Sequence, residues 1–238
     1  MDELDSLLKC LEICKELKDK DGVARSLNNI GVIYRTRGDF ERAIDYYNQS
    51  IKAYQEMGNK EGVARGYNNL GWVYDTMRDL DKALDYFTKS LAIRKELGNK
   101  EGIAISLRNV GLIYDTSGDL DKALDYHLQS LSICRELGND EGIATSFNYI
   151  ASIYETQGDL NKALDYYNKA LDIRKDLGYK GEIAETLYNI ALVYKKLSEF
   201  NKAKLYLYHA HDIVKEMKIE ESKLSKKITQ VLKYLEGK

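Results

Sequence analysis

The 238-residue chain carries 36 Lys and Arg against 38 Asp and Glu, a formal net charge of −2, and 44% of its residues are hydrophobic. This composition is typical of a folded globular protein and excludes a disordered one, and the near-zero net charge provides no overall attraction to nucleic acid or an anionic membrane. The sequence has no apolar run of the roughly 18 residues that a membrane span needs, and it contains no proline.

The first predicted element is a helix in residues 4–20, whose sequence LDSLLKCLEICKELKDK matches LDYFTKSLAIRKELGNK of residues 84–100. The chain therefore opens on the second helix of a repeat, and we expect a leading half-repeat at residues 1–18 with Leu7 and Leu11 uncovered. Two interpretations stay open: a fragment of a longer protein, or a homo-oligomer formed through this N-terminal helix. Cys10 and Cys14 have no ligand partner nearby in sequence, which indicates ordinary thiols, no metal site and a cytoplasmic location.

Residues 19–217 consist of five repeats of forty residues, aligned without a gap. One column of the repeat holds Gly31, Gly71, Gly111, Ala151 and Ala191, and another holds Tyr34, Tyr74, Tyr114, Tyr154 and Tyr194. A fixed period of this length indicates stacked supersecondary units, each of which buries its apolar face against its neighbours.

Each repeat is predicted to contain two helices. In the first repeat Leu27, Ile30 and Tyr34 fall on one apolar stripe, and Phe40 begins a second stripe at the same helical spacing. The Gly38-Asp39 pair between them supplies a left-handed helix end and an N-cap carboxylate. Glycine inside a helix costs about 1 kcal/mol relative to alanine, so the Gly31 column predicts a close helix approach, which we expect opposite Ala43.

The pattern L-x-x-[IVL]-G-x-x-Y followed by G-D-[FL]-x-x-A resembles the tetratricopeptide repeat over nearly the whole chain. It differs in its period of forty rather than thirty-four residues and in its missing proline, as in the long-helix subclass of kinesin light chains, Pins-type adaptors and bacterial Rap regulators. The resemblance implies an all-α, right-handed superhelical solenoid of antiparallel helix pairs. An amphipathic lysine-rich helix at residues 218–238 is expected to cap it.

The sequence offers no catalytic or cofactor-binding constellation. The three histidines His127, His209 and His211 lie in packing positions or on different helix faces, and no phosphate-binding loop or nucleophile motif occurs. We therefore expect no enzyme activity and no cofactor. Lys195 to Lys238 hold an excess of lysines, but acidic residues are interspersed, so we expect a solvated helical end and no nucleic-acid partner.

A second stripe on the first helix of each repeat is the candidate site. By resemblance to tetratricopeptide proteins it lines the inner, concave wall on which extended peptides lie. The candidate groove residues are Arg25, Asn28, Arg35, Arg65, Asn68, Trp72, Arg108, Asn148 and Tyr188, and the secondary candidates are Asn29, Asn69, Asn109 and Asn189.

Asparagine side chains suit this role because they offer the same donor and acceptor groups as a peptide bond. Trp72 is an apolar anchor of the kind found at binding hot spots, and the charge of the stripe changes from Arg25 and Arg65 to Asp75 and Asp115. For the Asn29 column, bonds between helices are an equal alternative, and Trp72 alternatively packs under a neighbouring helix. Repeat domains that clamp chaperone C-termini carry lysine in the Asn28 column and asparagine in the Val32 column. Because this chain has Asn28 and Val32 there, we do not expect that role.

The sequence thus favours a non-catalytic scaffold that binds a peptide or helical segment of a partner protein in its groove. The alternatives are a ligand-sensing regulatory module of a larger signalling protein, such as a sensor kinase, transcription regulator or peptide receptor, and a self-assembling scaffold. A consensus-designed array is a further alternative, which irregular residues such as Arg78 and Tyr149 disfavour. The partner's identity does not follow from the sequence.

Overall fold

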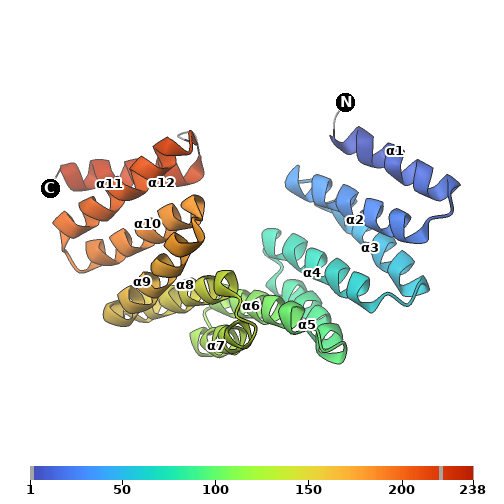
Figure 1. The fold of residues 1–238 in the computed structure, drawn as a ribbon, viewed down its shortest axis with the longest axis horizontal. Coiled ribbons are helices and arrows are strands. Elements are labelled where there is room, and N and C mark those ends of the chain that lie inside the picture. Colours follow the sequence, from blue (N-terminus) through green and yellow to red (C-terminus); the bar gives the residue numbers. More distant parts are fainter. Residues whose placement is uncertain (1–2, 220–221, 238) are drawn as a thin grey trace. The chain divides into compact units, whose positions relative to one another are not determined.

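The computed structural model describes residues 3–219 and 222–237, and every regular element in these ranges is an α-helix (Figure 1). The helices are α1 (Glu3–Glu16), α2 (Lys20–Thr36), α3 (Phe40–Glu56), α4 (Lys60–Thr76), α5 (Leu80–Glu96), α6 (Lys100–Ser117), α7 (Leu120–Glu136), α8 (Asp140–Gln157), α9 (Leu160–Leu177), α10 (Lys180–Lys196), α11 (Phe200–Glu216) and α12 (Lys223–Glu236). The predicted all-α helical-repeat fold is confirmed. In this part of the chain no helix is both long and apolar enough to cross a membrane.

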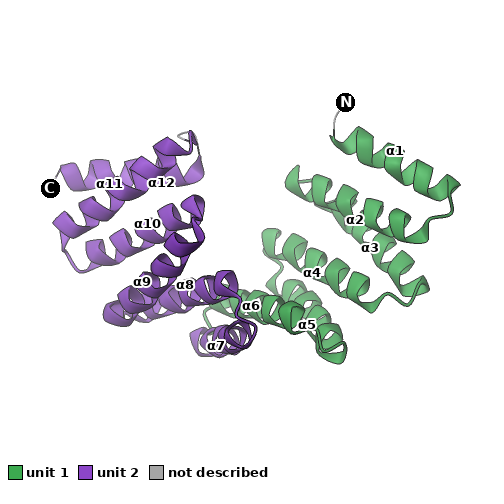
Figure 2. Ribbon diagram, viewed as in Figure 1, with its two compact units in different colours: residues 1–119 green, residues 120–238 purple. Residues whose placement is uncertain are grey.

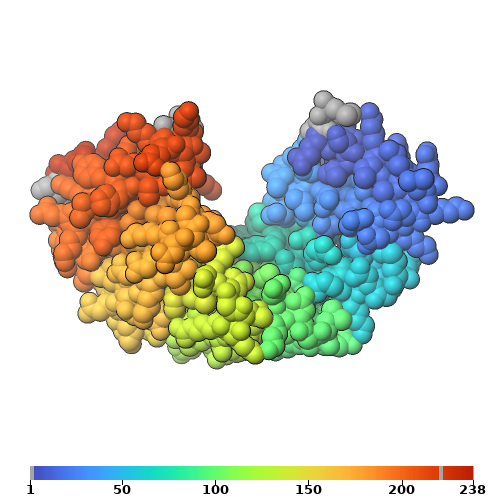
Figure 3. Space-filling model, in the orientation of Figure 1, coloured from blue at the N-terminus to red at the C-terminus, as the bar shows by residue number. Residues whose placement is uncertain are grey.

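The chain forms two compact units, residues 1–119 and 120–238 (Figure 2). Unit 1 holds α1 to α6 and unit 2 holds α7 to α12, so the boundary separates the two helices of the third repeat. Within each unit, each helix packs on the next one along the chain. The space-filling view shows side chains filling the gaps between neighbouring ribbons of a unit (Figure 3).

Helix ends follow the capping residues that the repeat supplies. Asp39 accepts a hydrogen bond from the backbone nitrogen of Arg42 at 3.1 Å, and Gly38 has a φ of 79°, which favours glycine. Asn59, Asn99 and Asn139 cap α4, α6 and α8 in the same way.

The small-residue column has a different partner from the one the sequence suggested. A Cβ added at Gly31 would lie 2.7 Å from the Tyr47 ring, so it is this buried ring, rather than Ala43, that lies against the glycine. The equivalent contact at Gly71 is with Phe87, at 2.6 Å. An aromatic side chain from the second helix thus occupies the space that glycine leaves free.

The first helix also differs from expectation. Leu11 is 6% exposed and packs against Leu27 and Ile30 of α2, and Leu7 is half-buried, so the expectation that both are uncovered is wrong. Leu11 is covered because this side of α1 faces the first helix of the next repeat. The large apolar residues that are exposed in and just after α1 are instead Ile13 and Leu17, whose exposed fractions are 55% and 73%.

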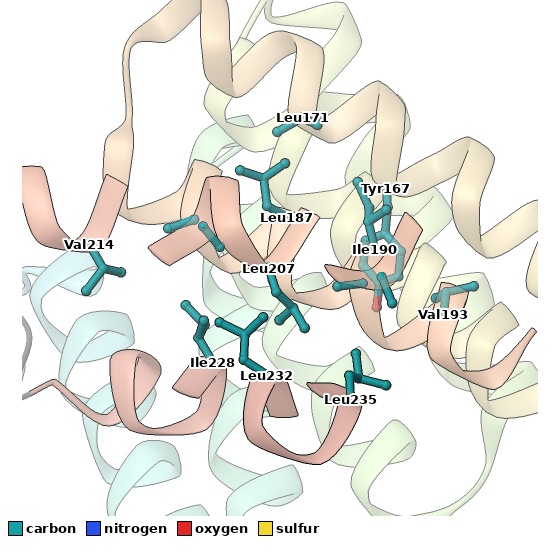
Figure 4. Close-up of a cluster of buried hydrophobic side chains, with 14 of the residues drawn as sticks. Tyr167, Leu171, Leu187, Ile190, Val193, Leu207, Val214, Ile228, Leu232 and Leu235 are labelled. Atoms are coloured by element: carbon teal, nitrogen blue, oxygen red, sulfur yellow. The ribbon is translucent and has the colours of Figure 1, made fainter. Parts of the chain in front are cut away.

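The largest core cluster in unit 2 spans α8 to α12. Ile228, Leu232 and Leu235 of α12 belong to it, together with Leu207 and Val214 of α11 (Figure 4). The terminal helix therefore buries one apolar face against the last repeat, and its lysines lie on the other faces.

Candidate functional site

In unit 1 the two asparagine columns are joined to each other. The Nδ2 atom of Asn69 donates to Oδ1 of Asn28 at 2.8 Å, and Nδ2 of Asn109 donates to Oδ1 of Asn68 at 2.7 Å. The first helices α2, α4 and α6 are thereby linked from repeat to repeat. Asn69 and Asn109 donate these bonds between repeats, and the carboxamide oxygens of Asn28 and Asn68 accept them.

The same ladder keeps hydrogen-bond donors at the surface. Asn28 is half-buried, and among the described residues its Nδ2 donates only to the adjacent Asn29, at 3.3 Å. The Nδ2 atom of Asn68, also half-buried, has no hydrogen-bond partner among the described residues. Because amide nitrogens donate, this face suits a ligand that presents carbonyl or carboxylate oxygens.

Trp72 lies in the same helix as Asn68. It is half-buried, and its ring meets the Phe87 ring edge-on, with centroids 5.4 Å apart and an interplanar angle of 77°. Both the packing alternative and the binding role are therefore compatible with its position. A ring held in this way can offer its remaining surface to a ligand at little entropic cost.

The arginines of the stripe differ in how firmly they are held. Arg25 is exposed and pairs with Asp21 at 2.9 Å, and Arg65 is exposed over the Tyr54 ring at 5.9 Å. Arg35 and Arg108 are half-buried. An exposed pair one helical turn apart contributes only about 0.3–0.5 kcal/mol, so Arg25 can change its partner on binding.

Two carboxylates in unit 1 occupy one column of the repeat. Burial raises the pKa of Asp75, although Arg78 opposes the shift, and burial alone raises the pKa of Asp115. Raised pKa values show that the ionised form is poorly stabilised in the folded chain. A cationic group brought to this face would improve that stabilisation.

In unit 2 the stripe is built differently. Asn148 accepts from Nη1 of Arg174 at 3.5 Å, and Tyr149 replaces the asparagine of the second column and stacks on His127, with centroids 4.9 Å apart. His127 is fully buried. Asn189 is half-buried on α10.

Glu155 contacts several polar groups of unit 2. It pairs with Lys196 at 2.8 Å and accepts from the Tyr167 hydroxyl at 3.1 Å. The pKa of Tyr188 is raised by burial and also by the charge of Glu155. Sequence reasoning missed Lys196 and Tyr167. Lys196 directly follows the stripe position of Lys195, and Tyr167 lies on the second helix in the buried column of Tyr47 and Phe87, so neither carries a signal for the site.

The part of the chain that the structure describes holds no cluster of three or more His, Cys, Asp or Glu side chains able to bind a metal ion. Cys10 and Cys14 lie 4.0 Å apart between sulfur atoms, and Cys134 is buried.

Family models of the tetratricopeptide repeat match residues 4–56, 102–176 and 142–216, and a second such model matches residues 64–97. A search of curated protein sequences gives no match. Among solved structures, BtubC (BKLC) from P. vanneervenii is 22% identical with a TM-score of 0.80, covering 91% of each chain.

Two further structures share the fold. A putative kinesin light chain from Podosopora anserina, with nearly identical TPR-like repeats, is 15% identical with a TM-score of 0.64, covering 81% of this chain and 95% of that one. The apo form of RapI is 21% identical with a TM-score of 0.74, covering 95% of this chain and 63% of RapI.

Proposed function

Because the chain belongs to the tetratricopeptide repeat family, whose models match most of its length, we propose that it is a non-catalytic scaffold for a segment of a partner protein. The segment binds along the face formed by the first helices of unit 1. The observation that supports this proposal is the asparagine ladder, in which Asn28 and Asn68 accept through their oxygens, and Trp72 lies on the same helix as Asn68.

The chemistry of this face describes the segment. Main-chain carbonyl groups accept from the asparagine amides, and an apolar side chain lies against the free surface of Trp72. A lysine or arginine beyond it reaches the half-buried carboxylates Asp75 and Asp115, and an acidic residue at the other end meets Arg25. This charge order also fixes the direction of the segment.

The alternative function is that of a ligand-sensing regulatory module. It is favoured by the likeness to RapI, of which this chain covers only 63%. A module of this kind changes its helix stacking when the segment binds, whereas a passive scaffold does not. Hydrogen exchange with and without a bound segment distinguishes the two.

The test is a displayed library of random peptides, selected against the parent protein and against Asn28→Ala/Asn68→Ala. A matched control, Asn69→Ala/Asn109→Ala, removes the same two hydrogen bonds between helices but leaves the proposed ligand donors in place. Circular dichroism first establishes that all three proteins fold.

Peptides that bind the parent and the control but lose affinity for Asn28→Ala/Asn68→Ala support the groove. Equal loss in both double variants assigns the asparagines to the stack alone and contradicts the proposal. Exchange of Asp75 and Asp115 for asparagine then reduces the affinity of the basic peptides in particular.

A further inference from the structure

The second helix of the fifth repeat, α11, differs from the other four second helices at two exposed positions. One position of this helix holds aspartate in four repeats: Asp45, Asp85, Asp125 and Asp165. Each of these bonds to the side chain four residues later, as Asp85 does to Lys89 and Asp165 to Lys169, both at 2.6 Å. The fifth repeat has Leu205 and His209 at these two positions, and Leu205 is 54% exposed.

This exchange coincides with a pocket of about 630 Å³ between α9 and α11, with α10 as its floor. Leu171, Ile183 and Leu187 form an apolar base, and Leu205 and Ile213 form part of the α11 wall. Leu171 and Leu187 lie beside each other at an edge of the unit 2 core (Figure 4). A pocket of this volume lies in the range that binding sites use.

The pocket is elongated along its two walls. Its α11 wall extends from Leu205 to Ile213 and its α9 wall from Asn168 to Lys175. At 1.5 Å per residue these are lengths of about 10–12 Å, or two helical turns. A row of two or three apolar side chains on one face of a helix has this spacing.

The charged residues at the rim of the pocket indicate the charge of its ligand. The Nζ atom of Lys180 forms an ion pair with Oε2 of Glu216 at 3.0 Å. The Nζ atom of Lys175 lies 3.8 Å from Oδ1 of Asp172. Asp212 on the α11 wall has no ion-pair partner among the described residues. Asp212 is therefore the rim carboxylate left without an ion pair among the described residues, and a carboxylate complements a basic residue.

We propose that this pocket binds an amphipathic helix of a partner protein, which inserts apolar side chains over Leu205 and places a lysine or arginine at Asp212. The pocket lies in unit 2, whereas the face proposed above belongs to the first helices of unit 1, so the inference is independent of the function proposed above.

The experiment uses a phage-displayed library of sixteen-residue helix-forming peptides, selected on the full chain. Leu205→Asp is the test variant, because it restores the residue that the other four repeats carry at an exposed position and should leave the fold intact. Asp85→Leu is the matched control, because it makes the reverse exchange at the same position of the second repeat. Circular dichroism and thermal unfolding verify both variants.

We expect enriched peptides with apolar residues at three- and four-residue spacing and a flanking basic residue. Their affinity falls at least about tenfold for Leu205→Asp and is unchanged for Asp85→Leu. Asp212→Asn lowers it about two- to fivefold, with the effect shrinking at high salt.

Three results would overturn the inference. They are no enriched helical peptide, enriched peptides indifferent to Leu205→Asp, and a parent protein whose sedimentation shows self-association that Leu205→Asp abolishes. The last result assigns the pocket to a second copy of the chain. Selected peptides are also tested against Asn28→Ala/Asn68→Ala, whose affinity for them must equal that of the parent.

Discussion

A single methyl group has opposite effects at two positions of the small-residue column. Gly71→Ala places a Cβ 2.6 Å from the fully buried Phe87 ring, which has to shift. We expect a loss of roughly 1–2 kcal/mol in the free energy of unfolding, since an overpacking cost outweighs the gain in helix propensity. Urea denaturation measures it.

The control for this variant is Ala151→Gly, in the same column of the fourth repeat. Ala151 is fully buried beside α9, so its methyl is already accommodated. Removing it lowers the free energy of unfolding by about 1 kcal/mol. A Gly71→Ala protein more stable than the parent contradicts the close contact with Phe87.

The half-buried carboxylate of Asp115 gives a pH-dependent prediction. Burial raises its pKa above the ordinary value of 3.8, so the folded state binds the proton more tightly than the unfolded state does. Its contribution to stability is therefore present below pH 3.8 and is lost as the pH rises through the raised value. At neutral pH the charged group destabilises the fold.

Asp115→Asn should consequently be more stable than the parent at pH 7. The gain is below about 1 kcal/mol, because the site is partly solvated, and corresponds to less than about 4 °C in Tm. The difference between the two proteins shrinks towards about pH 3.5. Thermal unfolding at both pH values checks this, and a variant equally or less stable at pH 7 would show that the carboxylate has a partner.

At the scale of a helix, α10 lacks a cap that its counterparts have. Tyr179 stands at its N-cap and makes no side-chain capping bond, whereas Asn139 caps α8 with a 2.8 Å bond from the backbone nitrogen of Gly142. Tyr179→Asn should add up to about 1 kcal/mol, a rise in Tm of roughly 2–4 °C. Asn139→Tyr should lose a similar amount. Failure of both changes in calorimetry would mean that the cap residue does not limit either helix.

Local sequence signals, such as glycine and capping residues, predicted the helices and their boundaries well. Gly38 and Asp39 define a helix boundary through backbone conformation and capping, and both effects depend only on neighbouring residues. Contacts between elements were harder to predict. That Tyr47 rather than Ala43 faces Gly31 depends on the rotation of two packed helices. A forty-residue period does not determine that angle.

For the candidate site, too, local features could be predicted from the sequence and contacts between helices could not. The columns of Asn28 and Asn29 were recognised from the sequence, but which oxygen each amide reaches depends on the stagger of successive helices. The bonds join residues 41 apart, from Asn28 to Asn69, one residue more than the repeat. Leu205 carried a clear sequence signal, because it interrupts a column of aspartates. That signal concerned the second helices, whereas the stripe taken as the groove lies on the first helices.

At the scale of the whole molecule, stability comes from contacts between successive helices rather than from one central core. Each unit has its own buried clusters, and α12 contributes Ile228, Leu232 and Leu235 to the cluster of unit 2. In such a chain the free energy is close to a sum of repeat and nearest-neighbour terms. A local defect should therefore weaken nearby repeats more than distant ones.

The double variant Ile228→Ala/Leu232→Ala tests this directly. Both side chains are buried, and each truncation costs about 2–5 kcal/mol at the interface between α12 and the last repeat. We expect amide hydrogen exchange to accelerate strongly in α11 and α10 and to change little in α2 to α4. The mirror control, Leu11→Ala, removes the buried side chain of α1 and should accelerate exchange in α2 while sparing α10 and α11. A uniform acceleration across all helices in either variant would show that the chain unfolds as one cooperative body, and the additive description would then fail.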